Sequence, residues 1–265
     1  MGKKRWVFLL SAVVCMLWAA PKAVLAADTE YDLNQNREIT ITQENSHAVS
    51  GNYSWLKYKP NKDGYLTVKT AAPLGAPGPS TGYLTLYNST KSTPLSSKSI
   101  FYNTAHAQNP FWNEFTFGLR SGMTYYIRVK GDNAVTLSYT FKKTKDTSGD
   151  TKAKAKSIKK NKQKTGLMLA GVTDTNWYRL TLKKAQKLRI YYNAKTSGSF
   201  KITVYSSNQQ IGSRNIYYTS GQRKLVYYQY LRKGNKTTGL AAGTYYIKIE
   251  KVNSASSGYY EIKWN

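Results

Sequence analysis

Apolar and polar side chains alternate with a period of two along most of the chain. The runs at 178–182, 200–206 and 245–250 read YRLTL, FKITVYS and YYIKIE. A period of two places successive side chains on opposite faces of a strand, so these runs predict half-buried β-strands. Tyr, Thr, Val and Ile favour strands, and turn-forming clusters at 61–64 and 233–235 separate the runs. No run after residue 26 has the pattern of a long amphipathic helix.

Three of these segments recur in the same order about 120 residues apart. They pair SWLKYKPNKDGYLTV (54–68) with NWYRLTLKKAQKLRI (176–190), YLTLYNS (83–89) with FKITVYS (200–206), and GLRSGMTYYIRV (118–129) with GLAAGTYYIKI (239–249). Such a repeat predicts a tandem duplication. We therefore expect an all-β chain of two tandem antiparallel β-sandwich domains, of jelly-roll or immunoglobulin-like type.

Composition places the expected domain limits. Residues 27–145 form the first predicted sandwich and residues 165–265 the second. Between them, residues 146–164 are rich in lysine and form either a linker or the leading edge of the second domain.

The first 26 residues have the pattern of an export signal. Lys3, Lys4 and Arg5 precede an uncharged, mostly apolar run at 6–20, which is short for a membrane span. We expect cleavage near Ala26 and a secreted or surface-associated product without a transmembrane segment. Cys15, the only cysteine, lies inside this signal, so the mature chain has neither disulfides nor thiolate metal sites.

The second half resembles a known bacterial module. DTNWYRLTLKKAQKLRI (174–190), GLAAGTYYIKI and the closing GYYEIKW (258–264) are similar to the pre-peptidase C-terminal domain, a β-sandwich appended to secreted enzymes. The resemblance covers most of 150–265 and, more loosely, 37–141, where Asn52 stands opposite Asp174. It implies a non-catalytic module with relatives among collagen- and carbohydrate-associated domains.

Some members of that family bind calcium through clustered carboxylates. Here Asp146, Asp150 and Asp174 are scattered among lysines, whereas calcium takes six to eight oxygen ligands. We predict neither a metal site nor a cofactor.

The residues that catalysis requires are scarce. Only His47 and His106 titrate near neutrality, and neither a Gly-x-Ser-x-Gly elbow nor a His-Glu-x-x-His pair is present. We predict that the chain is not an enzyme. Two alternatives stay open: a secreted hydrolase that uses His106 with Glu114 or Asp132, and an accessory targeting module for a separate secreted enzyme.

Charge is concentrated in the second half. The whole chain carries a formal net charge of +27. Residues 27–145 hold 13 basic and 8 acidic residues, a net charge of +5, whereas residues 146–265 hold 23 and 5, a net charge of +18. Such a field attracts acidic polymers.

Strand alternation directs several of these cations outward, next to tyrosines. The candidate ligand-binding residues are Arg179, Lys187, Arg189, Tyr191, Lys201, Tyr205, Arg214, Arg223, Lys224, Tyr228, Arg232 and Lys248. Cations beside aromatic rings bind anionic sugars and polymers. We predict an exported binding or adhesion protein that engages an acidic polysaccharide, wall polymer, host glycan or protein. Nothing resembles a specific nucleic-acid-binding motif. The alternative interpretation is structural, with tyrosine covering sandwich edges and lysine preventing edge-to-edge pairing.

A tyrosine pair follows a leucine–glycine turn in each copy. Leu-x-x-Gly-x-x-Tyr spacing selects Tyr125 and Tyr246 as corner tyrosines, whereas strand parity pairs Tyr125 with Tyr245. Because the first copy has the extra residue Met123, the two rules cannot hold together.

Overall fold

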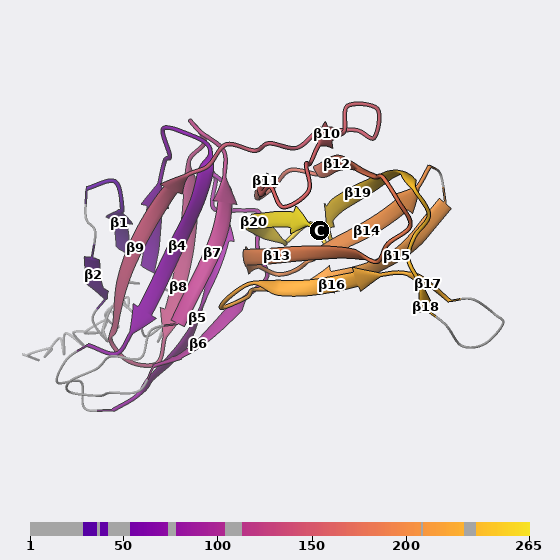
Figure 1. The fold of residues 1–265 in the computed structure, drawn as a ribbon. Coiled ribbons are helices and arrows are strands. Elements are labelled where there is room, and N and C mark those ends of the chain that lie inside the picture. Colours follow the sequence, from indigo (N-terminus) through magenta and orange to yellow (C-terminus); the bar gives the residue numbers. More distant parts are fainter. Residues whose placement is uncertain are drawn as a thin grey trace, which may run out of the picture.

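The computed structural model describes residues 29–35, 38–41, 54–73, 78–103, 113–207, 209–230 and 237–265. Within these ranges the regular structure consists of strands, which form two β-sandwiches (Figure 1). The described ranges contain no helix long and apolar enough to cross a membrane. The predicted export signal, both histidines and Arg232 lie outside them.

The first sandwich is built from nine strands. They are β1 (Thr29–Asp32), β2 (Glu38–Ile41), β3 (Ser54–Tyr58), β4 (Gly64–Ala71), β5 (Ser80–Tyr87), β6 (Ser99–Asn103), β7 (Asn113–Leu119), β8 (Tyr125–Gly131) and β9 (Val135–Lys143). A five-stranded sheet of order β1-β3-β8-β5-β6 packs on a four-stranded sheet of order β2-β9-β4-β7. Fully buried Leu56, Leu66, Phe117 and Ile127 fill the space between the two sheets.

The second sandwich has the same construction. Its strands are β10 (Lys156–Ser157), β11 (Lys164–Met168), β12 (Thr175–Leu182), β13 (Leu188–Ser197), β14 (Phe200–Ser206), β15 (Gln209–Ile216), β16 (Arg223–Tyr227), β19 (Gly243–Lys251) and β20 (Ser257–Trp264). The sheet orders are β10-β12-β19-β14-β15 and β11-β20-β13-β16. A short pair, β17 (Gln229–Tyr230) and β18 (Thr237–Thr238), stands apart from both sheets.

The two sandwiches repeat each other strand for strand. Strands β1–β9 of the first sandwich correspond, one by one and in sequence order, to β10–β16, β19 and β20 of the second. With this correspondence, the strand orders of the two sheets are the same in both sandwiches. The predicted all-β class with two tandem sandwiches is thereby confirmed. Each half departs from a purely antiparallel arrangement at one place, since β1 runs parallel to β3 and β10 parallel to β12. The reason is that β2, between β1 and β3 in the sequence, belongs to the other sheet, as does β11 between β10 and β12. The chain therefore re-enters the five-stranded sheet in the direction in which it left.

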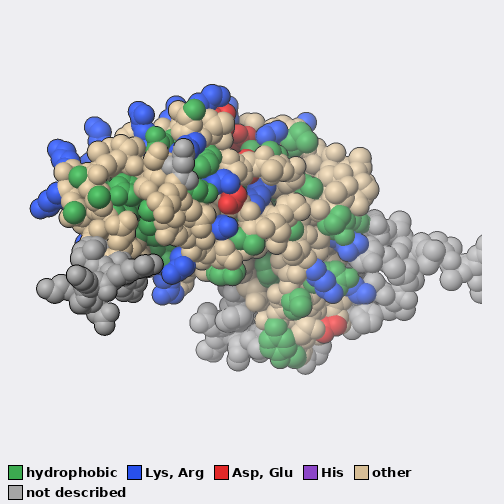
Figure 2. All heavy atoms as spheres, turned by 90° about the vertical axis from the view of Figure 1, so that its right-hand side faces the viewer, with side chains coloured by type: hydrophobic (Ala, Val, Ile, Leu, Met, Phe, Trp, Pro, Cys, Tyr) green, Lys and Arg blue, Asp and Glu red, His purple; other side chains and the backbone are tan. Residues whose placement is uncertain are grey.

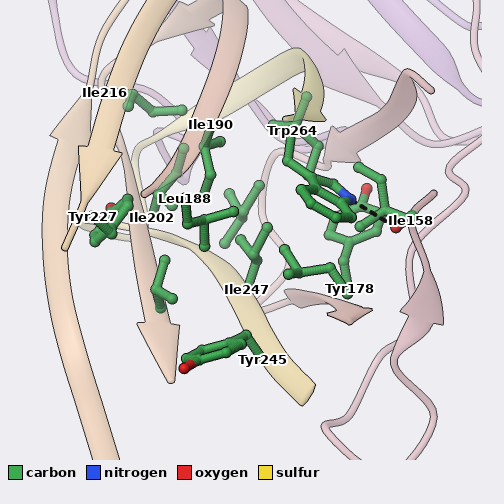
Figure 3. Packing of buried hydrophobic residues seen from close by; sticks show 14 of the residues in the cluster. Ile158, Tyr178, Leu188, Ile190, Ile202, Ile216, Tyr227, Tyr245, Ile247 and Trp264 are labelled. Carbon is green, nitrogen blue, oxygen red and sulfur yellow. Dashed lines mark hydrogen bonds between the residues drawn. The ribbon is translucent and has the colours of Figure 1, made fainter. Parts of the chain in front are cut away.

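Period-two alternation sets the faces of these strands. Along β12, Tyr178, Leu180 and Leu182 are at most 1% exposed, while Arg179 and Thr181 between them are exposed. Figure 3 shows inward side chains of the second sandwich converging from several strands. The inward and outward positions predicted for this strand are confirmed.

Trp264 closes this core at the end of the chain. Its ring is 4% exposed, and its indole Nε1 donates a hydrogen bond of 2.8 Å to the carbonyl of Ile158 (Figure 3). Ile158 follows β10, whose Lys156 and Ser157 pair with Tyr178 and Arg179. The lysine-rich stretch therefore contributes a strand to the second sandwich.

The two sandwiches meet where β7 and β4 face β20 and β13. Tyr65 and Tyr259 stack across this contact with ring centroids 4.7 Å apart, and the amide of Ala170 donates to the carbonyl of Gly118 at 2.8 Å. A Cβ at Gly118 would lie 2.2 Å from the carbonyl oxygen of Met168, so only glycine permits this approach.

The tyrosine that ties its hydroxyl back to the preceding turn is, in each copy, the one that strand parity predicts. The hydroxyl of Tyr125 accepts a 3.1 Å hydrogen bond from the amide of Arg120, and that of Tyr245 donates one of 2.9 Å to the carbonyl of Ala241. Both rings are buried, at 4% and 5% exposure, whereas Tyr246 lies on the outer face. The spacing rule was wrong for the second copy because Met123 lengthens the first turn, where Gly122 adopts φ = 76°.

Replacing Tyr245 by phenylalanine tests this corner. Y245F removes the hydroxyl and leaves the carbonyl of Ala241 without that donor, so we expect a loss of about 1 kcal/mol in the free energy of unfolding. Y246F is the matched control and should change it by less than about 0.5 kcal/mol. Urea titrations of both variants provide the measurement, and equal midpoints would refute the assignment.

Candidate functional site

Three aromatic side chains share the outer face of the second five-stranded sheet. Trp177 on β12, Tyr246 on β19 and Tyr205 on β14 are all partly exposed, and we call these three residues the aromatic face. Strand register places Arg179, Tyr246 and Tyr205 in one cross-strand row. The rings of Trp177 and Tyr205 are 5.7 Å apart and inclined by 32°. The surface is therefore a shallow aromatic platform.

Cations surround this platform. The ammonium of Lys152 lies 4.8 Å from the ring centre of Tyr246 and 5.9 Å from that of Tyr205, and it donates to the carbonyl of Ser207. Lys248 lies 5.9 Å from the centre of Trp177 and pairs with Glu250 at 2.6 Å.

Two further predicted cations complete the surface. Arg179 and Lys201 share the outward parity of the three rings, on β12 and β14. Among the described residues, the cations Lys152, Lys248, Arg179 and Lys201 and the carboxylate of Glu250 thus lie on or beside the aromatic face.

The first sandwich holds an equivalent trio that is closed. Trp55, Tyr87 and Tyr126 occupy the matching strand positions but are only 5%, 7% and 9% exposed. Trp55 lies 5.3 Å from Tyr87 and 6.2 Å from Tyr126, both in edge-to-face geometry. They form a small hydrophobic cluster of their own.

A loop accounts for this closure. Residues 88–95 fold back after β5, with the amide of Leu95 donating to the carbonyl of Leu86 at 2.7 Å. This loop sets the ammonium of Lys91 4.6 Å from the centre of Tyr126 and 2.9 Å from the carboxylate of Glu30. In the second sandwich β14 ends at Ser206 and β15 begins at Gln209, so no comparable loop intervenes.

The remaining predicted residues lie elsewhere. Arg189, Tyr191 and Lys224 are on the outer face of the four-stranded sheet, on the opposite side of the sandwich. There Lys263 approaches the ring centre of Tyr191 to 5.3 Å. Lys187 lies 6.0 Å from the ring of Tyr228 at the end of the sandwich away from the first one. Of the predicted residues that the structure describes, Arg179, Lys201, Tyr205 and Lys248 share the aromatic face, whereas Arg189, Tyr191 and Lys224 share the opposite outer face.

Arg214 and Arg223 occupy the open edge between the two sheets. Arg214 pairs with Ile202 and Arg223 pairs with Tyr192, so both arginines occupy inward positions of their strands. Both side chains are nevertheless exposed, because β15 and β16 are edge strands. Arg214 faces Tyr227, whose hydroxyl has no hydrogen-bond partner in the described part of the chain. Burial raises the pKa of Tyr227 to about 12, although Arg214 opposes the shift.

The carboxylates considered for hydrolysis have structural partners. Glu114 pairs with Lys69 at 2.9 Å and accepts from the hydroxyl of Tyr218 at 3.0 Å, and the bond from Lys69 lowers its pKa. Asp132 accepts from the amide of Thr81 at 2.6 Å. Within the described ranges, no three His, Cys, Asp or Glu residues are placed to hold a metal ion.

Comparison with protein-family models found no match, and comparison with curated proteins found none either. Among solved structures, the chain is similar to the pre-peptidase C-terminal domain of a Bacillus anthracis collagenase, with 16% identity, 42% of this chain and 93% of that one covered, and a TM-score of 0.29. A tandem CBM22 domain of Xyn10C from Paenibacillus barcinonensis aligns with 7% identity over 85% of this chain and 84% of that one, with a TM-score of 0.28. A putative secreted protein of Eubacterium rectale aligns with 10% identity over 86% and 73%, with a TM-score of 0.25.

Sequence reasoning left three residues of this surface out of the candidate set. Trp177 served only to align the repeat, Tyr246 was considered as a corner tyrosine and for its outward parity, and Lys152 lies in the lysine-rich stretch. The available signal was the recurrence of the trio at 55, 87 and 126 and again at 177, 205 and 246, all with outward parity.

Replacing Trp55 or Trp177 by alanine tests whether the first trio is closed and the second open, because the two variants should lose different amounts of stability. We expect W55A to lower the free energy of unfolding by about 3 kcal/mol, because it leaves a cavity beneath Lys91. W177A should cost less than about 1.5 kcal/mol, since its ring is already partly solvated. Thermal and urea unfolding measure both variants, and equal losses would contradict the contrast.

The hydroxyl of Tyr227, which has no hydrogen-bond partner among the described residues, predicts that the protein loses stability at alkaline pH. Its folded pKa of about 12 exceeds the ordinary value of 10.0, so folding favours the protonated form. That stabilisation is complete below pH 10 and is lost as the pH rises through about 12, an effect of about 2–3 kcal/mol.

Between pH 10 and 12, the free energy of unfolding of Y227F should fall less steeply with pH than that of the wild type. At pH 7 it should be nearly unchanged, because the Tyr227 hydroxyl has no hydrogen-bond partner among the described residues. Urea midpoints measured across this range test it, and an unchanged pH slope would be the contrary result.

Proposed function

We propose that this chain is an exported, non-enzymatic binding or accessory protein that holds an anionic glycan on the aromatic face of its second sandwich. The observation that carries the proposal is the open trio of Trp177, Tyr205 and Tyr246 flanked by cations, set against the closed trio of the first sandwich. One fold presents the same rings in two ways, and only the second leaves them accessible to a ligand.

The chemistry of this surface favours a ligand that has both apolar faces and negative charge. Rings held on three neighbouring strands offer rigid contact area at little entropic cost. A pyranose ring has C–H faces that lie flat on such rings, and its sulfate, carboxylate or phosphate groups extend sideways. Arg179 and Lys201 occupy positions beside the rings from which they reach such groups.

Charge supports the same class of ligand. The second half carries a net charge of +18, so long-range attraction brings an anionic chain to this sandwich before short-range contacts form. The predicted export of the chain agrees with ligands found outside the cell or on its surface. A glycan-binding role requires no catalytic group, in keeping with the structural partners of Glu114 and Asp132.

Binding of defined glycans tests this proposal. Heparin, hyaluronan and neutral dextran serve as probes in biolayer interferometry with the purified protein at about 0.05 and 0.3 M salt. We expect heparin and hyaluronan to bind, with affinity falling as the salt rises, and dextran to bind much more weakly. W177A/Y205A should weaken heparin binding about tenfold or more, which corresponds to a loss of about 1.4 kcal/mol or more from two ring contacts together.

The matched control removes exposed apolar side chains from the first sandwich. Ile100 and Tyr102 on β6 are 74% and 53% exposed, so I100A/Y102A deletes a comparable surface away from the aromatic face. This variant should bind as the wild type does. If both double variants bind equally well, or if the wild type retains no anionic glycan at low salt, the proposal is wrong.

A further inference from the structure

A lysine-lined groove of about 860 Å³ opens at the end of the second sandwich away from the first. Lys159 and Lys160 border it on one side, just after β10, and Lys183 and Lys184 on the other, in the turn between β12 and β13. Trp264 lies at its floor. None of these residues belongs to the predicted binding set or to the aromatic face.

The backbone around the groove is firmly held. The amide of Ile158 donates to the carbonyl of Arg179 at 2.9 Å, and the amide of Asn161 donates to that of Trp264 at 2.8 Å. On the opposite side, Gln186 and Leu240 exchange two backbone hydrogen bonds of 3.0 and 2.8 Å. The groove is therefore formed before any ligand arrives, as in most binding sites of this volume.

Among the described residues, the four lysines have no partner of opposite charge. All four are exposed, none forms an ion pair with any residue in the described ranges, and no carboxylate is among the described residues that line the groove. Four ammonium groups around one groove repel each other, and an anion placed between them relieves that repulsion. Figure 2 shows lysine and arginine side chains spread over this end of the molecule, with few acidic ones among them.

The groove continues the outer face of β12. Trp177, Arg179 and Thr181 are alternate residues of β12, so their side chains leave the same side of the sheet, and Thr181 lines the groove. At about 3.3 Å per residue, this row extends about 13 Å from Trp177 to the edge of the groove. A linear polymer lying along β12 therefore reaches both.

We propose that this groove binds the sulfate or phosphate ester groups of an anionic glycan whose sugar rings lie on the aromatic face. The inference deepens the proposed function and rests on it. Several cations around one groove match groups of high charge density better than isolated carboxylates, and the ammonium of lysine binds such oxyanions as a point charge without fixed geometry. Trp264 is 4% exposed and presents no ring face inside the groove, so the groove supplies charge while the aromatic face supplies the rings.

The test compares two variants with the same change in net charge. K159Q/K160Q/K183Q/K184Q removes the four lysines of the groove. K62Q/K142Q/K143Q/K145Q removes four exposed lysines that lie before residue 146 and is the control. All eight side chains are exposed, so both variants should fold, and circular dichroism melts verify this.

The probes are a heparin octasaccharide, its fully desulfated counterpart, a phosphorylated polysaccharide and single-stranded RNA, each titrated at about 0.1 M salt. We expect the groove variant to lose at least tenfold in affinity for heparin or for the phosphorylated polysaccharide, and the control variant less than threefold. The probe that binds more tightly shows whether the groove prefers sulfate or phosphate groups. The desulfated chain should respond little to the groove variant.

Each outcome separates the two proposals. If the wild type binds heparin in a manner that depends on Trp177, and the groove and control variants lose affinity equally, the groove assignment is wrong and the proposed function stands. If the wild type binds none of the glycans, both fail. RNA binding that is tighter than glycan binding and is lost in the groove variant would overturn the choice of a glycan.

Discussion

Burial of side chains between the two sheets of each sandwich is the constraint on which this molecule depends. Cys15 is the only cysteine, so no disulfide within the chain supplements that burial. Tyr178 and Ile247 are fully enclosed, whereas the alternate positions on their strands, such as Arg179 and Lys248, are exposed or partly exposed. The same alternation that builds the core therefore fixes which side chains form the outer faces, and it sets rings and cations side by side on β12, β14 and β19.

The duplication shows how one fold acquires two surfaces. Both copies place tryptophan and two tyrosines at the same outward positions. In the first copy a loop carrying Lys91 covers the rings and turns them into a second small core. In the second copy the corresponding turn is short, and Lys152 and Lys248 lie near the rings while leaving them partly exposed. A change in one connection thus separates a closed aromatic cluster from an open aromatic surface.

The sequence predicted what depends on local periodicity and missed what depends on distant packing. Alternation alone assigned Tyr178 inward and Arg179 outward, and the repeat alone predicted two equivalent sandwiches. It did not place Arg214 at the open edge, because an edge strand can expose a residue of inward parity. Nor did it distinguish Trp55 from Trp177, since the covering loop is set by tertiary contacts. The groove was missed because its lysines come from two turns that meet only in the fold.

The central claim is that the second sandwich offers its aromatic trio to an anionic glycan while the first encloses its own. The most direct measurement is a titration of ¹⁵N-labelled protein with a heparin octasaccharide, followed by the indole N–H resonances of the tryptophans. The account predicts that the Trp177 resonance shifts in a saturable manner and that the Trp55 resonance does not move. Shifts of equal size at both tryptophans, or at Trp55 alone, would contradict it.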